Sequence, residues 1–167
     1  MQIPDFRLSY VSRGVTDHNN SPGKKVEQSH RYLPLLGRIL IGAPFMFSGL
    51  GKLMAHDVTV GYIGSVGLPF PQLAWILAIV MEMGGGTLLV IGYRARLVAL
   101  ALALFALATA LSFHRNFADQ NQMIHFLKNV MMAGGLLQIA AFGAGAISLD
   151  NRLSKGHGTI GSAAPAH

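Results

Sequence analysis

A carboxylate stands in the middle of one of the most apolar stretches of the chain. In "QLAWILAIVMEMGGGTLLVIG", nine residues separate Glu82 from Gln72 and nine lie between it and Gly92. A carboxylate in such a place can accept and release protons or hydrogen-bond a ligand. Burying it costs free energy, so its presence needs a reason. Glu82 is therefore our candidate proton relay.

Few other polar side chains fall inside or beside the apolar stretches. Arg38 lies in the first of them, and Lys128 and Asn129 lie in the last. His114 ends the third stretch and His125 begins the fourth. Guanidinium, ammonium, amide and imidazole groups can all donate a hydrogen bond to a carbonyl. The candidate ligand-binding residues are Arg38, His114, Lys128 and Asn129.

Two interpretations of Glu82 stay open. Arg38 and Lys128 each lie about six residues from an opposite membrane interface, which is roughly 9 Å of helix, and Glu82 lies between them in depth. In the first interpretation Glu82 forms a structural ion pair with Arg38 or Lys128 and only fixes helix register. In the second, the same side chains form a polar site inside a helix bundle.

The remaining chemistry is limited by what the chain lacks. It contains no cysteine, which excludes a dithiol, a thiolate nucleophile and c-type haem attachment. His56, His114 and His125 are expected on one side of the membrane, but no HxH or HxxxH spacing supports a metal site. We therefore expect no metal or haem. Redox work would need a bound cofactor, a quinone or a partner subunit.

The elements that position these side chains are predicted to span a membrane. Of the 167 residues, 51% are hydrophobic and only 12% are charged, against about 25% charged in soluble domains. A spanning helix needs about 20 mostly apolar residues, and four stretches approach or reach that length: 32–53, 73–92, 97–113 and 123–142. The polar face of a soluble helix is missing from "LVALALALFALATALSF". The predicted fold class is all-α, an integral membrane four-helix bundle in a lipid bilayer.

The basic residues predict that both termini are cytoplasmic. Nine Lys or Arg residues fall in the first 31 residues, in the connection at 93–96 and after residue 150, against Lys52, Arg115 and Lys128 on the other side. The net charge of +6 does not gather into a basic stripe, so no nucleic-acid partner is expected. We expect a mobile polar tail over 1–30, a membrane domain over 31–153 and a disordered tail over 154–167. The connection at 55–71 is expected to be a partly ordered outer lid.

Five features follow one another in a specific order. They are Arg38 followed by "FMFSGLGKL", Glu82 before "GGGTLLVIGYRARLVAL", His114 closing the third stretch, "KNVMMAGGLL", and a final "GAISLDNRL". From about residue 32 to residue 153 the chain resembles the DoxX family of small four-helix membrane proteins. The resemblance implies a multi-pass protein of the bacterial or archaeal cytoplasmic (inner) membrane. Some archaeal members are subunits of a thiosulfate:quinone oxidoreductase or quinol oxidase, which implies a redox or sulfur-handling partner subunit.

Two functions follow as hypotheses. The first is a redox-associated membrane subunit of a quinone-linked oxidoreductase, in which Asn129, Lys128 or His114 binds a quinone carbonyl and Glu82 relays the proton. The second is a structural or scaffolding membrane protein, in which Glu82 forms an ion pair and the outer loop docks a partner. A homo-oligomer is compatible with both.

The orientation can be tested because the chain has no native cysteine. Single cysteines at Ser21 and Ser162 are expected to resist an impermeant thiol reagent in intact cells and to react after permeabilisation. The measurement is the labelled fraction before and after permeabilisation. Labelling of either position in intact cells would contradict the cytoplasmic assignment.

Overall fold

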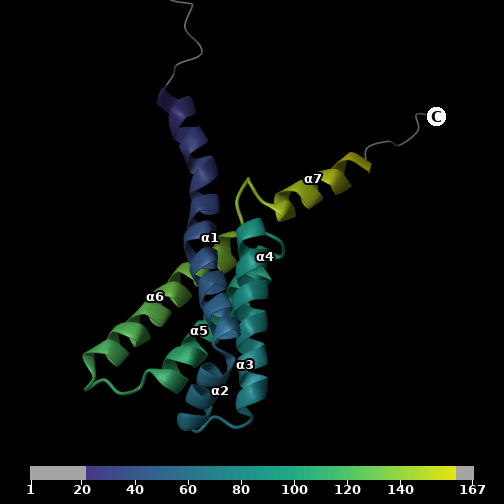
Figure 1. Ribbon diagram of the computed structural model, residues 1–167. Coiled ribbons are helices and arrows are strands. Elements are labelled where there is room, and N and C mark those ends of the chain that lie inside the picture. The colour runs from purple at the N-terminus through teal and green to yellow at the C-terminus, as the bar shows by residue number, and fades with distance from the viewer. Residues whose placement is uncertain (1–21, 161–167) are drawn as a thin grey trace, which may run out of the picture.

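The chain folds into helices joined by short connections. The structure is a computed structural model that describes residues 22–160, and the side chains of 31–155. Its elements are α1 (Pro22–Met54), α2 (His56–Ser65), α3 (Pro71–Ile79), the π-helix η1 (Val80–Gly85), α4 (Gly86–Ile91), α5 (Ala95–Phe113), α6 (Gln120–Phe142) and α7 (Leu149–Ile160). The described part of the chain is therefore all-α (Figure 1).

Four of the helical segments are long and apolar enough to cross a membrane. They are Arg31–Met54, Pro71–Ile91, Ala95–Phe113 and Gln120–Phe142, which confirms the four predicted spans to within three residues at each end. The second span combines α3, η1 and α4. A helix satisfies all its backbone polar groups internally, which is the requirement that lipid imposes.

The tails are more helical than expected. Helix α1 begins at Pro22, so the end of the tail predicted over 1–30 is helical. Proline is tolerated at the first helical position because its missing N–H has no helical partner there. Helix α7 runs to Ile160 and so extends into the tail that is predicted to begin at residue 154. Residues 1–21 and 161–167 lie outside the described residues.

The connection expected to be an outer lid contains a helix. Helix α1 ends at Met54, and α2 then packs beside α3 (Figure 1). The indole Nε1 of Trp75 donates to the carbonyl oxygen of Lys52 at 3.0 Å. Trp75 lies four residues inside the second span, or about 6 Å of helix. Helix α1 therefore stops short of the outer end of that span, and α2 fills the remaining depth.

Helix α5 contributes the largest number of buried residues among the described helices. It packs along α6 over most of its length and also contacts η1 and α4. Its buried residues are mostly small: Ala95, Ala99, Leu102, Ala103, Ala106 and Ala110. Small side chains let helices approach closely. In lipid the hydrophobic effect does not drive helices together, so close van der Waals packing of this kind favours their association.

Two glycines lie at a close backbone contact between α1 and the second span. A Cβ added to Gly42 would lie 2.9 Å from the carbonyl oxygen of Gly86, and a Cβ added to Gly86 would lie 2.9 Å from the carbonyl oxygen of Gly42. Each glycine therefore faces the backbone of the other. No larger residue fits without separating the two helices.

The C-terminal segment closes the end of the bundle opposite α2. The carboxylate of Asp150 accepts hydrogen bonds from the backbone N–H groups of Arg94 (2.7 Å) and Ala95 (2.9 Å). These donors lie at the N-terminus of α5, where helices leave N–H groups unpaired. Figure 1 shows the start of α1 and helix α7 at this same end, as four spans require.

Gly42→Ala and Gly86→Ala are expected to destabilise the protein, because each methyl group would press on a facing backbone carbonyl. Overpacking of this kind typically costs about 1–3 kcal/mol. The measurement is the thermal unfolding midpoint in detergent. Gly134→Ala is the matched control, since nothing lies within 4 Å of a Cβ there and alanine has the higher helix propensity. Equal losses at all three positions would contradict the close contact.

Candidate ligand site at the Lys52–Glu82 pair

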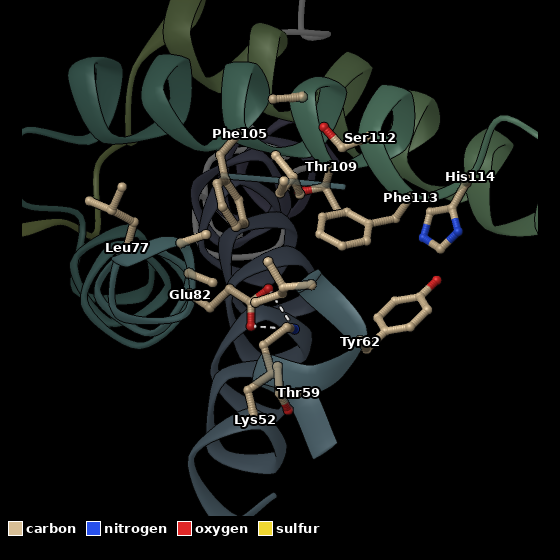
Figure 2. Close-up of a pocket in the computed structure, with 15 residues that line it drawn as sticks. Lys52, Thr59, Tyr62, Leu77, Glu82, Phe105, Thr109, Ser112, Phe113 and His114 are labelled. Carbon is tan, nitrogen blue, oxygen red and sulfur yellow. Dashed lines mark hydrogen bonds and ion pairs between the residues drawn. The ribbon is translucent and has the colours of Figure 1, made fainter. Parts of the chain in front are cut away.

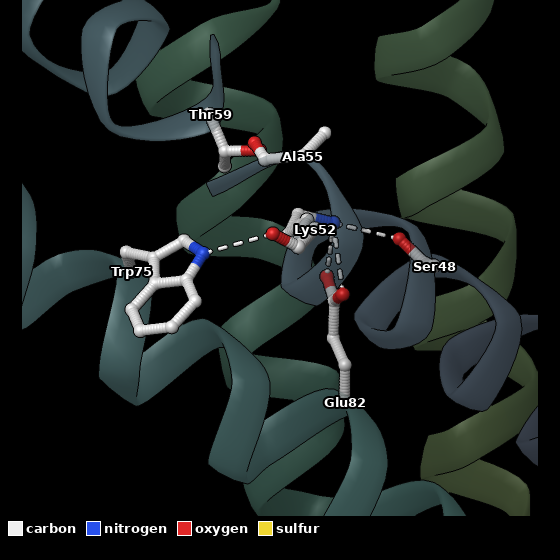
Figure 3. Close-up of polar contacts among 6 residues, drawn as sticks. All are labelled: Ser48, Lys52, Ala55, Thr59, Trp75 and Glu82. Atoms are coloured by element: carbon white, nitrogen blue, oxygen red, sulfur yellow. Dashed lines mark hydrogen bonds and ion pairs between the residues drawn. The ribbon is translucent and has the colours of Figure 1, made fainter. Parts of the chain in front are cut away.

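The candidate site is built around an ion pair between α1 and η1. The Nζ atom of Lys52 lies 2.8 Å from both carboxylate oxygens of Glu82 and donates to them. It also donates to the hydroxyl of Ser48 at 2.7 Å, as Figure 3 shows. The side chain of Glu82 is only 6% exposed and that of Lys52 is 31% exposed. The pair is thus buried on the carboxylate side and open on the ammonium side.

The spacing of the second span places Glu82 on its buried face. The buried residues Ala78, Glu82 and Gly86 are spaced by four, and residues four apart lie on one face of a helix. Glu82 itself lies within the π-helical turn η1. Such π-helical turns occur often at functional sites.

Helix α1 places Lys52 by its own geometry and by an anchor on α3. Ser48 and Lys52 are four residues apart, so they share one helix face. The hydrogen bond from the indole of Trp75 holds the Lys52 backbone against the second span. Gly49 permits this contact, since a Cβ there would lie 3.1 Å from the Cβ of Glu82.

The prediction that Glu82 pairs with Arg38 or Lys128 is wrong. The partner is Lys52, which the sequence analysis assigned to the outer side. Glu82 lies 11 residues from Pro71, or about 16 Å of helix, and Lys52 reaches it because α1 ends inside the bundle and α2 continues outward. Lys52 is therefore an intramembrane charge rather than a loop charge.

Arg38 lies near the opposite end of the bundle. Its guanidinium is buried beside Gly92 at the C-terminus of α4. Its Nε donates to the carbonyl oxygen of Pro34 at 3.4 Å, and one Nη donates to that of Ile147. Helix C-termini carry partial negative charge, which favours a cation there. Arg38 therefore ties α1 to α4 and to the segment before α7, away from Glu82.

The remaining predicted residues do not form one cluster. Asn129 and His125 are four residues apart on α6, and the Asn129 amide donates to the His125 carbonyl at 3.0 Å. Lys128 is exposed on another face of α6. His114 and His125 stack with ring centroids 5.1 Å apart, whereas His56 contacts Asp57 and Gln72. The three histidines do not converge.

A cavity of about 410 Å³ borders the ion pair on the side of α2, α3 and α5 (Figure 2). Beside Lys52 and Glu82, its lining residues are Thr59, Tyr62, Ile63, Leu68, Ala74, Leu77, Ala78, Phe105, Ala108, Thr109, Ser112, Phe113 and His114. The rings of Tyr62 and Phe113 stack with centroids 5.6 Å apart. Leu77 and Ala108 are exposed, so the cavity opens between α3 and α5, where lipid would lie.

A second cavity of about 280 Å³ borders the same ion pair on the side of α6. It shares Lys52, Glu82, Phe105, Thr109 and His114 with the larger cavity. Its other lining residues are Pro44, Phe45, Ser48, His125, Asn129 and Met132. Of the sequence-predicted site residues, Glu82, His114 and Asn129 line a cavity, while Arg38 and Lys128 line neither of these two.

Four residues of the site are not among those predicted from the sequence: Lys52, Ser48, Thr109 and Tyr62. One signal pointed to the first two, because Ser48 and Lys52 stand four residues apart near the end of an apolar helix. A lysine with a polar helix neighbour can turn inward rather than toward water. Thr109 and Tyr62 carry no such signal, since only the packing of α2 and α5 brings them to the cavity.

Lys52 and Glu82 are expected to couple in a double-mutant cycle. Lys52→Met or Glu82→Gln alone leaves the other group without its partner, whereas the double variant removes both, so its loss should be smaller than the sum. Contacting residues typically couple by about 0.5–3 kcal/mol. Thermal unfolding in detergent measures the four free energies.

Arg38→Met with Glu82→Gln is the control cycle. Arg38 contacts Pro34 and Ile147, whereas Glu82 contacts Lys52, so the losses at Arg38 and Glu82 are expected to add. Coupling between Arg38 and Glu82 together with additivity between Lys52 and Glu82 would contradict the observed pairing.

Comparison with known proteins places these features in a family. The DoxX family model matches residues 33–115, which include Lys52, Glu82 and His114. The inner membrane protein YphA of Escherichia coli strain K12 is 41% identical over 125 residues, covering 72% of this chain and 89% of its own length. The inner membrane protein YqjF of the same strain is 39% identical over 121 residues, covering 72% of this chain and 92% of its own length.

No solved structure matches the chain. A third relative, from another bacterium, matches over a shorter segment. A Bacillus subtilis strain 168 protein named "Putative oxidoreductase CatD" is 36% identical over 70 residues, or 42% of this chain and 51% of that protein. The two longer relatives and the four candidate spans identify a multi-pass inner membrane protein. The chain belongs to the DoxX family.

Proposed function

We propose that this protein is a redox-associated membrane subunit that binds a quinone, or a similar flat lipophilic ring, in the larger cavity. The observation that carries the proposal is an ion pair, buried on its carboxylate side, in the wall of an apolar cavity whose exposed lining residues Leu77 and Ala108 lie on candidate membrane spans. A lipid-soluble ligand would enter from the bilayer and find one charged wall. Ligand pockets combine mostly apolar linings with a few polar groups in this way.

The cavity fits such a ligand in size and chemistry. Its volume of about 410 Å³ falls within the range of about 300–1,000 Å³ for small-molecule sites. The aromatic side chains of Phe105, Tyr62 and Phe113 can pack against a ring. Quinones also carry carbonyl oxygens, which need hydrogen-bond donors once they are buried.

Lys52 is the donor best placed for a carbonyl oxygen. Its ammonium contacts both carboxylate oxygens of Glu82. A contact to one oxygen would keep the ion pair and free an N–H for the ligand. The hydroxyls of Thr109 and Tyr62 and the ring of His114 are further polar groups in the lining. Glu82, held beside Lys52, would pass protons to or from the bound ligand.

The electrons must come from elsewhere. A bound quinone would take up two electrons and two protons on reduction to the quinol. The chain has no cysteine, so a partner subunit with its own redox group would supply the electrons. The name of the Bacillus subtilis relative supports an association with oxidoreductases. The alternative is a scaffold in which Lys52 and Glu82 only fix α1 against the second span.

Quinone content of the purified protein tests the proposal. We expect quinone to be extracted from the native protein and mostly lost from Lys52→Met and Glu82→Gln, since each removes a polar contact in the cavity wall. Ala78→Leu should also lose quinone, because it fills the larger cavity and leaves both charged groups in place. Chromatography of the solvent extract measures moles of quinone per mole of protein.

Lys128→Met is the matched control, since Lys128 is an exposed lysine of α6 that lines neither cavity. It should retain quinone at the native level. Native protein without quinone above the detergent blank, and with no binding of added quinone, would favour the scaffold. Equal losses in Ala78→Leu and Lys128→Met would place any bound quinone outside the larger cavity.

A further inference from the structure

The smaller cavity differs from the larger one in what lines it. Most of its lining residues are polar: Ser48, Lys52, Glu82, Thr109, His114, His125 and Asn129. They come from α1, η1, α6 and the C-terminal end of α5, so each helix around the cavity contributes at least one polar residue to its lining. Lipid acyl chains cannot form hydrogen bonds with any of them. Lys52, Glu82, Ser48 and Asn129 already have hydrogen-bond partners in the protein. Their carboxylate, hydroxyl and amide groups have further lone pairs or protons that water can use.

This cavity extends from the ion pair toward one end of the bundle. His114 directly follows the last residue of α5, and His125 lies near the start of α6. The short connection between these two helices contains Arg115, Asn116 and Asp119, which are groups that water solvates well. The stacked histidines therefore lie between the Lys52–Glu82 pair and the polar connection.

We propose that the smaller cavity is a water-filled compartment that joins the Glu82 carboxylate to the aqueous phase beyond the α5–α6 connection, with His114 and His125 as its polar entrance. A volume of about 280 Å³ holds several waters at about 30 Å³ each. The two cavities that border the Lys52–Glu82 pair would then hold different molecules. The larger receives an apolar ring, and the smaller receives water.

The compartment gives Glu82 a source and a sink for protons. Imidazole can accept a proton on one nitrogen while it donates from the other, so two stacked histidines suit the entrance of such a path. Its use for the protons of a bound quinone rests on the proposed function. The hydration of the compartment does not, and it can be measured without any ligand.

The absence of native cysteines makes the test direct. Asn129→Cys puts a thiol in the smaller cavity, and Ala78→Cys puts one in the larger cavity. The two positions have similar depth, nine residues inside α6 and seven inside α3. A charged methanethiosulfonate reagent reacts with the thiolate, which forms in water and not in an apolar site. We expect Asn129→Cys to react at least an order of magnitude faster than Ala78→Cys.

N-ethylmaleimide, an uncharged reagent, is the control for reach and folding, and it should modify the single thiol of each variant to completion. A soluble short-chain quinone gives the separate test of the proposed function, because it should protect Ala78→Cys and not Asn129→Cys. Absence of protection with fast reaction at Asn129→Cys would overturn the quinone site and leave the water compartment standing. Equal rates with the charged reagent would overturn the water compartment.

The entrance is tested by shape-matched changes at His125. In the Asn129→Cys background, His125→Phe should slow the charged reagent by about an order of magnitude, since an apolar ring would close the polar path. His125→Gln should keep a rate near that of the parent because it retains a polar group. The rate with N-ethylmaleimide should not change in either variant. Equal slowing by phenylalanine and glutamine, or none by either, would contradict the assignment of His125 to the entrance.

Discussion

The ion pair between Lys52 and Glu82 is the contact on which the rest of the structure depends. An ammonium and a carboxylate inside an apolar layer offset the cost of each other's burial only when they meet. Their contact holds α1 against the second span, where Glu82 lies in the π-helical turn η1. Both cavities then form along this one contact.

A second buried charge is neutralised by different means at the other end of the bundle. Arg38 contacts backbone carbonyls and lies at the C-terminus of α4. A guanidinium can spread its charge over several such acceptors, which a compact ammonium does less well. The two basic residues of α1 therefore have distinct roles. Arg38 belongs to the framework, and Lys52 belongs to a wall that a ligand can reach.

The sequence was sufficient to predict the four candidate spans, because a chain segment that crosses lipid has few alternatives to a helix. The sequence was also sufficient to single out Glu82, because a single carboxylate among apolar residues can be recognised without knowing the tertiary structure. The partner could not be predicted, because the depth of Lys52 depends on where α1 stops and on how α2 packs. Helix phase could have separated Asn129 from Lys128, as adjacent residues point about 100° apart and only Asn129 shares a face with His125. The site divides into two cavities only through the packing of α2, α5 and α6.

The contact of Asp150 with the start of α5 has a consequence for biosynthesis. The carboxylate acts on backbone groups that precede it by 55 and 56 residues. A nascent chain has all four spans available for insertion before this residue leaves the ribosome, yet the N-terminus of α5 stays uncapped until then. This end of the bundle can therefore assemble only after Asp150 has been made, later than all four spans. A chain released early, before residue 150, would carry every span and still lack the group that completes α5.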